Sequence, residues 1–130
     1  MNKEQEIMLI QEAETARKNS YSPYSNFAVG AALLCKNGKI YTGCNIENGA
    51  YPSSICAERV AIFKAVSEGE KDYEGIAIVG DKEAPPCGAC RQVMSEFVKA
   101  DFKVIIATSS KDYKTYTFAD ILPLSFKLEK

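Results

Sequence analysis

The chain has 130 residues, of which 46% are hydrophobic and 25% charged, and its formal net charge is −1. Such a length and composition are typical of an ordinary globular protein, so we expect a single domain spanning residues 1–130. The near-neutral charge argues against nucleic acid or an anionic membrane surface as a partner, and no apolar run approaches the ~20 residues of a membrane span.

The first third of the chain predicts a helix followed by a β-hairpin. Residues 4–19 carry apolar side chains in helical register, and the turn-forming segment 20–26 ends this helix. The apolar run 27–35 predicts a strand that is buried on both faces. An Asn-Gly pair at 37–38 indicates a tight turn, so the strand expected at 40–44 should pair antiparallel with the preceding one.

The rest of the chain alternates helices with strands. We expect helices at residues 57–68 and 88–99 and strands at 75–80, 104–107 and 113–118. The alternation implies right-handed crossovers and locally parallel strands, whereas the short connection between the last two strands makes that pair antiparallel. The predicted fold class is therefore α/β, a three-layer α/β/α arrangement with a mixed five-stranded sheet.

Three cysteines and one glutamate form the most informative pattern in the sequence. Cys56 and Glu58 make a C-x-E motif, and Cys87 and Cys90 belong to a later P-C-x-x-C motif. Three protein ligands with water in the fourth position are typical of catalytic zinc, and Glu58 is placed to move protons without binding the metal. The chain contains no histidine, so the ligands must be sulfur or oxygen. This combination is the signature of zinc deaminases, with cysteine as the first ligand.

The positions of the cysteines add an electrostatic argument. Cys56 and Cys87 each stand where a helix is expected to start, so two helix N-termini would direct their free amides toward one point. Three thiolates around Zn²⁺ leave a net charge of −1, which the helix dipoles and Arg59 would partly offset. Arg59 can also be interpreted as an ordinary surface cation.

The alternative to a catalytic site is a structural zinc site, in which the protein supplies all four ligands. Its fourth ligand would be Cys35 or Cys44, but both fall in predicted strands, where a cysteine is usually a small buried hydrophobe. An odd number of cysteines behind a polar, acidic N-terminus favours metal and core roles in a reducing compartment over a disulfide framework. We therefore expect a cytoplasmic protein.

At the level of its motifs the sequence resembles the small, homotetrameric, zinc-dependent cytidine deaminases. The resemblance is carried, in order, by Tyr24–Leu33, Gly43–Asn48, Ile55–Arg59, Pro86–Gln92 and Leu122–Phe126. The segment 51–54 departs from the family pattern, since it lacks a glycine often found before the first ligand. The resemblance implies the same α/β fold, one zinc ion per chain and a homotetramer.

The resemblance also implies roles for individual residues in substrate binding. Asn45 and Glu47 would hold the ribose 3′-hydroxyl, and Phe27 would pack against the base. The backbone N–H of Ala57 would contact the base carbonyl, and Phe126 would reach the pocket of a neighbouring subunit. Without the resemblance, Asn45 and Glu47 are also typical turn residues after a strand.

The expected reaction is the hydrolytic deamination of cytidine and 2′-deoxycytidine to uridine and 2′-deoxyuridine with release of ammonia, a step of pyrimidine salvage. Zinc makes hydroxide available near neutral pH, and Glu58 acts as base and acid in turn. An anionic Glu47 beside the 3′-hydroxyl would repel a 3′-phosphate, which favours a free nucleoside. The rivals are a polynucleotide-editing deaminase, which should carry a basic groove, and a non-catalytic zinc module.

Overall fold

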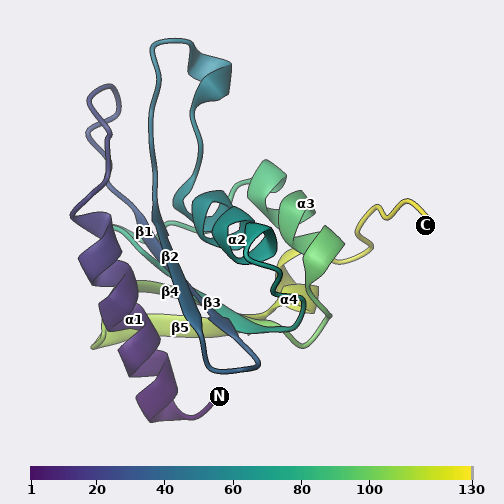
Figure 1. The fold of residues 1–130 in the computed structure, drawn as a ribbon. Coiled ribbons are helices and arrows are strands. Elements are labelled where there is room, and N and C mark those ends of the chain that lie inside the picture. The colour runs from purple at the N-terminus through teal and green to yellow at the C-terminus, as the bar shows by residue number, and fades with distance from the viewer. Residues whose placement is uncertain (130) are drawn as a thin grey trace.

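In the computed structural model, which describes residues 1–129, five strands form one mixed sheet with helices on both of its faces (Figure 1). The elements are α1 (Lys3–Arg17), β1 (Gly30–Cys35), β2 (Ile40–Cys44), η1 (Tyr51–Ser53), α2 (Ala57–Ser67), β3 (Tyr73–Val79), α3 (Gly88–Phe97), β4 (Lys103–Ser109), β5 (Asp112–Thr117) and α4 (Phe118–Ile121). The strand order is β2-β1-β3-β4-β5. Among the described residues, no helix is long and apolar enough to cross a membrane.

The strand directions explain how two helices come to start at the same end of the sheet. β3 and β4 pair in parallel, whereas β1 pairs antiparallel with both β2 and β3, and β4 pairs antiparallel with β5. Since β1 lies between them and opposes both, β2 and β3 run in the same direction. The segments that lead from β2 to α2 and from β3 to α3 therefore leave from the same end of the sheet, where both strands have their C-termini.

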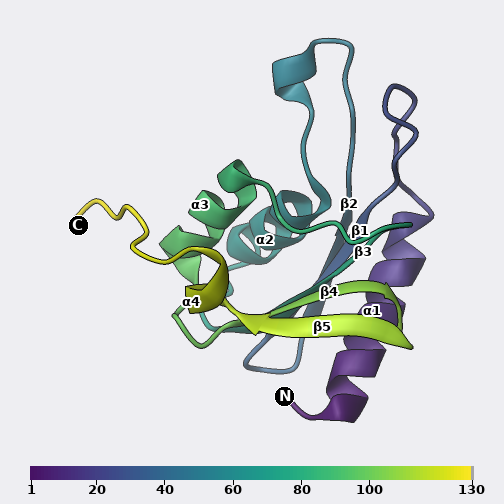
Figure 2. The same ribbon diagram turned by 180° about the vertical axis from the view of Figure 1, so that it is seen from behind.

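Helices pack on the sheet by way of two separate apolar clusters. On one face, Leu9, Ile10 and Ala13 of α1 pack against residues of β1, β3 and β4. On the opposite face, α2 and α3 cover the other side of the same strands (Figures 1 and 2). α2 approaches β2 very closely, since a Cβ atom added at Gly43 would lie 2.5 Å from the Ala57 carbonyl oxygen.

The predicted mixed sheet, its hairpin and the antiparallel final pair are all present. The differences lie at the ends of elements and in two short helices, η1 and α4, that the sequence did not predict. β1 begins at Gly30 and not at Phe27, because the Phe27 carbonyl and the Val29 amide are bound to the Asn45 side chain instead of to the main chain of a neighbouring strand. The final strand stops at Thr117, where a capping box between Thr117 and Asp120 starts the short helix α4.

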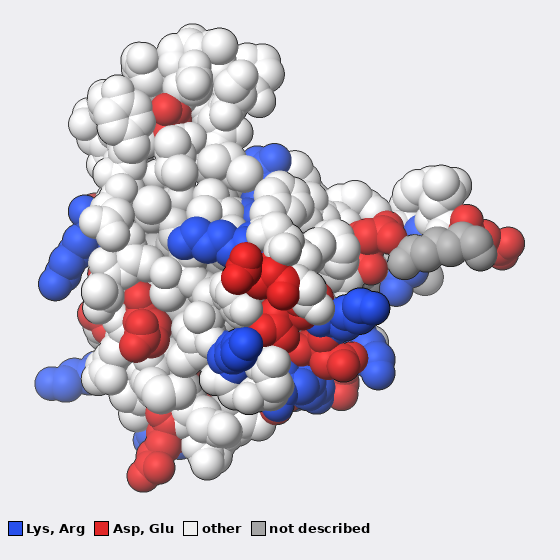
Figure 3. Space-filling model, in the orientation of Figure 1, with Lys and Arg blue, Asp and Glu red and all other residues white. Residues whose placement is uncertain are grey.

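Two loops project beyond the sheet at the end where β2 stops, and they are nearly uncharged. The loop between β2 and α2 forms an arm, closed at its base by an antiparallel bridge between Ile46 and Ile55, and a parallel bridge joins Ile46 to Tyr21 of the loop before β1. Between residues 44 and 57 the sole charged residue is Glu47, and residues 19–35 have none. Figure 3 shows the resulting contrast between the pale arm and the charged body below it.

Candidate active site

A cleft of about 780 Å³ lies between these two loops and the N-termini of α2 and α3. Its size is that of a pocket for a small organic ligand. Residues from distant parts of the sequence meet in its wall, among them Phe27, Asn45, Glu47, Ala57, Glu58 and Cys87. The fold thus brings most of the residues singled out from the sequence to one place.

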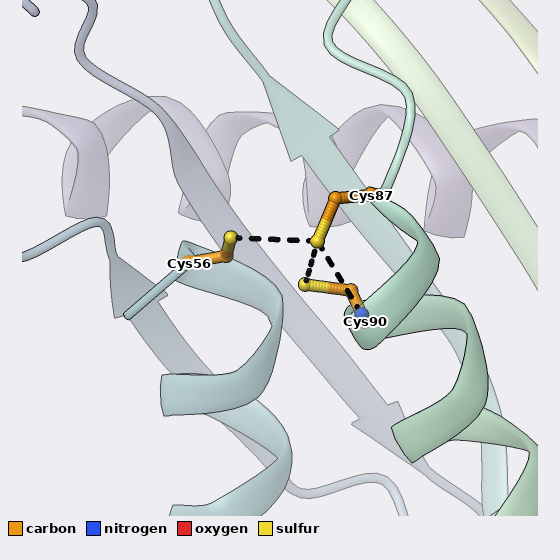
Figure 4. A group of neighbouring side chains, drawn as sticks. All are labelled: Cys56, Cys87 and Cys90. Atoms are coloured by element: carbon orange, nitrogen blue, oxygen red, sulfur yellow. Dashed lines mark hydrogen bonds between the residues drawn. The ribbon is translucent and has the colours of Figure 1, made fainter. Parts of the chain in front are cut away.

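The three motif cysteines point their sulfur atoms toward one another (Figure 4). Cys56 is the N-cap of α2, Cys87 is the N-cap of α3, and Cys90 lies in the first turn of α3. The Sγ atoms of Cys56 and Cys87 are 3.8 Å apart, and those of Cys87 and Cys90 are 3.4 Å apart. Two helix N-termini, each with free amide groups and a partial positive charge, therefore face one cluster of thiols.

The cluster fits a tetrahedral zinc ion. Zinc–sulfur bonds of ~2.3 Å in a tetrahedron place sulfur atoms about 3.8 Å apart, which is close to the separations seen here. In the described part of the chain, these three cysteines make up the group able to hold a metal, and Cys35 and Cys44 are not members of it. Three sulfur ligands leave the fourth position free for a non-protein ligand.

Arg59 lies against the cluster rather than on the open surface. Its Nη2 donates a hydrogen bond to Cys56 Sγ at 3.6 Å, and its buried Nε has no partner among the residues described. Hydrogen bonds from the Cys90 thiol and from Arg59 lower the pKa of Cys56 to about 5, although burial opposes this. The same bond to Cys56, together with burial, raises the pKa of Cys90. As the pH rises, Cys56 therefore becomes a thiolate before Cys90 does.

Glu58 is buried beside the cysteines, with 4% of its surface exposed. Burial, reinforced by the neighbouring Cys56 thiolate, raises the pKa of Glu58 to about 7. A carboxyl group with such a pKa can take up and release a proton near neutral pH, which is what a general acid–base catalyst must do. Glu58 also lines the cleft, so it is accessible to a molecule bound at the base of the cleft.

Glu47 and Asn45 have most of their hydrogen-bonding capacity occupied by the loop before β1. Glu47 Oε1 accepts from the amides of Tyr24 and Ser25, both at 3.0 Å, and its Oε2 accepts from the Ser25 hydroxyl. These bonds, that of the Ser25 hydroxyl above all, lower the pKa of Glu47.

Asn45 makes a matching set of contacts. Its Oδ1 accepts from the Val29 amide at 2.9 Å and from the Ser20 hydroxyl, and its Nδ2 donates to the Phe27 carbonyl at 2.8 Å. Sequence reasoning identified Asn45 and Glu47 but missed their serine partners. The available signal was the density of serine and tyrosine in residues 20–26, which we interpreted as a turn alone.

The C-terminal tail is the one predicted contributor that this chain does not bring to its own cleft. Phe126 is 70% exposed, and Leu124 and Leu128 are exposed as well. The tail is nevertheless tied to the cysteine motif, since Gln92 Nε2 donates to the Phe126 carbonyl at 2.9 Å. Arg91 donates to the carbonyls of Pro86 and Ile121, both at 2.7 Å, and so links the start of α3 to the end of α4.

Comparison with known proteins points to one family. Residues 1–108 match the family described as the cytidine and deoxycytidylate deaminase zinc-binding region. Cytidine deaminases of Halalkalibacterium halodurans and Sporosarcina psychrophila are 51% and 50% identical, over 94% and 93% of this chain and 94% and 90% of their own lengths. The crystal structure of cytidine deaminase from Burkholderia pseudomallei superposes with a TM-score of 0.87 at 43% identity, covering 92% of this chain and 97% of that one.

Proposed function

This chain belongs to the cytidine and deoxycytidylate deaminase zinc-binding family, and on that premise we propose that the cleft is the place where it converts cytidine to uridine. The protein is a zinc-dependent hydrolase that carries one Zn²⁺ per chain. The observation that carries the assignment of the cleft is the position of Glu58, a buried carboxyl group at its base beside the three sulfur atoms.

Cys56, Cys87 and Cys90 hold the zinc ion in this proposal, and Arg59 supports them. A zinc ion held there would act as a Lewis acid and lower the pKa of water enough to provide hydroxide near neutral pH. The donation from Arg59 to Cys56 Sγ withdraws negative charge from the ligand set and offsets part of the excess that three thiolates bring.

Glu58 carries the protons of the reaction. Its carboxylate takes a proton from the attacking water and delivers it to ring N3 of the cytosine, which makes C4 more electrophilic. The oxygen of that water adds to C4, and Glu58 then takes the remaining proton from the new C4 hydroxyl and passes it to the amino group. The C4–N bond breaks as the C4 carbonyl forms, and the amino group leaves as ammonia. A single carboxyl group serves both steps because it is base and acid in turn, and its raised pKa suits both states.

The contacts of Glu47 and Asn45 support recognition of a single sugar hydroxyl. A carboxylate offers about four acceptor sites, and Tyr24 and Ser25 use three of those on Glu47. An amide nitrogen offers two hydrogens, and Phe27 takes one of those on Asn45. What remains is one acceptor and one donor, which suits one hydroxyl, the 3′-hydroxyl implied by the resemblance. We therefore infer that 2′-deoxycytidine is a substrate as well as cytidine.

The surroundings of Glu47 support a free nucleoside over a polynucleotide. Its pKa is lowered, so the group stays anionic beside the sugar and repels a 3′-phosphate. Neither loop beside the cleft carries a lysine or arginine between residues 19 and 35 or between 44 and 57 to hold a phosphate. Uridine release from a free nucleoside is consistent with a role in pyrimidine salvage.

We further propose that the protein is a homotetramer of single-domain chains that works in the cytoplasm. The arm, whose one charged residue is Glu47, and the exposed apolar tail, with Leu124, Phe126 and Leu128, support burial against other subunits. Both helix layers pack on one sheet, which supports a single domain over residues 1–130. None of the five cysteines forms a disulfide, which supports a reducing compartment.

Ultraviolet absorbance tests the proposal directly. Mixing the zinc-loaded protein with cytidine or 2′-deoxycytidine should reduce the absorbance of the cytosine ring, with one ammonia released per nucleoside consumed. Cytidine 3′-monophosphate and a deoxycytidine oligonucleotide are the matched controls, and both should react far more slowly. Preferential reaction of the oligonucleotide would contradict the nucleoside assignment, and no reaction with any of the four would contradict the proposed cleft.

A further inference from the structure

The hydroxyl of Ser25 connects two residues that the proposed function places on opposite parts of the substrate. It donates a hydrogen bond to Glu47 Oε2 and accepts one from the Phe27 amide, for which the N–O distance is 3.0 Å. A serine hydroxyl has one donor and two acceptor sites, so it can make both bonds at once. Asn26, which lies between Ser25 and Phe27, has a φ of 56°, a left-handed conformation that asparagine adopts more readily than most residues.

For Glu47, the Ser25 hydroxyl is the group that fixes the available oxygen. Oε1 already accepts two amide hydrogens, from Tyr24 and Ser25, whereas Oε2 accepts only from the hydroxyl among the residues described. The acceptor site left for a ligand therefore lies on Oε2. Removing the hydroxyl leaves this oxygen without a protein donor and lets the carboxylate turn about its last side-chain bond.

For Phe27, the same hydroxyl completes the anchoring of the main chain. The Phe27 carbonyl is held by Asn45 Nδ2 at 2.8 Å, and the Phe27 amide is held by Ser25. Phe27 lies outside the β-ladder, since β1 begins at Gly30, so these side-chain bonds take the place of strand pairing. The position of the aromatic ring in the cleft depends on them.

We propose that Ser25 is a positioning residue for substrate binding, whose hydroxyl orients Glu47 toward the sugar and holds Phe27 against the base. The inference rests on the proposed function, in which Glu47 binds the 3′-hydroxyl and Phe27 packs on the base. Neither contact takes part in proton transfer at Glu58. Loss of the Ser25 hydroxyl therefore weakens binding and leaves the chemical step in place.

Steady-state kinetics of Ser25→Ala with cytidine and with 3′-deoxycytidine test the proposal. We expect KM for cytidine to rise about tenfold, as for a lost hydrogen bond to a charged group, with little change in kcat. The effect should be smaller for 3′-deoxycytidine, which offers Glu47 no 3′-hydroxyl. Ser25→Thr keeps the hydroxyl and should restore KM. Ser22→Ala is the matched control, since Ser22 lies in the same loop and its hydroxyl contacts Ser20 instead.

Glu47→Gln, measured with the same two substrates, tests sugar binding by Glu47 separately from the positioning role of Ser25. An equal rise in KM for both substrates in Glu47→Gln would overturn the role of Glu47 in binding the sugar. If Glu47→Gln distinguishes the substrates but Ser25→Ala lowers kcat, or leaves KM unchanged for both, Ser25 is not a positioning residue. An equal rise in KM for both substrates in Ser25→Ala would overturn the orientation of Glu47 by Ser25 and leave only its contact with Phe27. Zinc content and melting temperature exclude misfolding, and Ser25→Cys, a weaker donor, should give an intermediate KM if Ser25→Ala is unstable.

Discussion

At the scale of single residues, the cleft holds two carboxyl groups whose surroundings give them opposite properties. Glu58 is buried and its pKa is raised to about 7, which suits it to take up and release protons near neutral pH. Glu47 accepts hydrogen bonds from two amides and a hydroxyl, and its pKa is lowered, so it stays anionic. Two carboxyl groups with pKa values shifted in opposite directions are suited to different roles, which in the proposed function are proton transfer for Glu58 and sugar binding for Glu47.

Replacing Glu58 by glutamine should abolish proton transfer without removing the metal. The amide keeps the shape of the side chain but cannot accept and release a proton, so we expect kcat to fall by ~10²- to 10⁴-fold. Metal analysis should still give one zinc per chain, because the three sulfur atoms are unchanged. The same change at Glu47 is the control, since it should act mainly on KM. A zinc-loaded Glu58→Gln protein with near-normal kcat would contradict the role of Glu58.

At the scale of elements, the two helix starts could be predicted from the sequence, whereas the loop contacts could not. Cys56 and Cys87 stand at the boundaries that apolar periodicity and local motifs indicate, and both are helix N-caps. The bonds from Ser20 and Ser25 to Asn45 and Glu47 join residues more than 20 positions apart. Polar contacts of such separation have no periodic pattern. The same contacts explain why the predicted first strand was three residues too long.

Gly43 sets the distance between β2 and the helix start that carries Cys56 and Glu58. A Cβ atom at Gly43 would lie 2.5 Å from the Ala57 carbonyl oxygen and 2.7 Å from the Ala61 amide, so Gly43→Ala must push the N-terminus of α2 away from the sheet. We expect overpacking to cost about 1–3 kcal/mol of unfolding free energy. Because the displaced helix start carries a ligand, zinc affinity and kcat should also fall.

Gly30→Ala provides the control for this prediction, since it produces a similar collision on the opposite face of the sheet. A Cβ atom at Gly30 would lie 2.0 Å from the Ala13 carbonyl oxygen of α1, away from the cysteines. Thermal unfolding and zinc competition should show that both variants lose stability while Gly43→Ala alone loses zinc affinity. Equal zinc affinity in the two variants would show that α2 is not held in place through Gly43.

At the scale of the whole molecule, a single chain exposes apolar side chains that a partner subunit could bury. The arm protrudes from the body (Figures 1 and 2) and carries one charged residue, and the last residues expose Leu124 and Phe126. The sequence indicated that this tail must be buried somewhere, but one chain alone cannot define where. The proposed tetramer supplies that surface.

Truncation after Pro123 should impair nucleoside binding and assembly while leaving zinc bound. The zinc ligands all precede residue 91, whereas the removed segment contains Phe126, and loss of a buried interface aromatic typically weakens binding by roughly 30-fold or more. Light scattering and KM for cytidine measure the two effects. Phe126→Ala should reproduce most of the loss, and Lys127→Ala, an exposed neighbour, should not. A fully active monomer of the intact chain would contradict the shared cleft.

The hydrogen bonds of Arg91 couple zinc binding to subunit association in the proposed tetramer. One guanidinium group holds both the carbonyl of Pro86, next to the ligand Cys87, and the carbonyl of Ile121, at the start of the tail. If zinc binding orders Arg91, it also orders the tail segment that the proposed tetramer buries against other subunits, so zinc binding and association are coupled through this side chain. Such coupling is reciprocal, so association tightens zinc by the factor by which zinc tightens association. The apparent zinc affinity of this protein should accordingly rise with its own concentration.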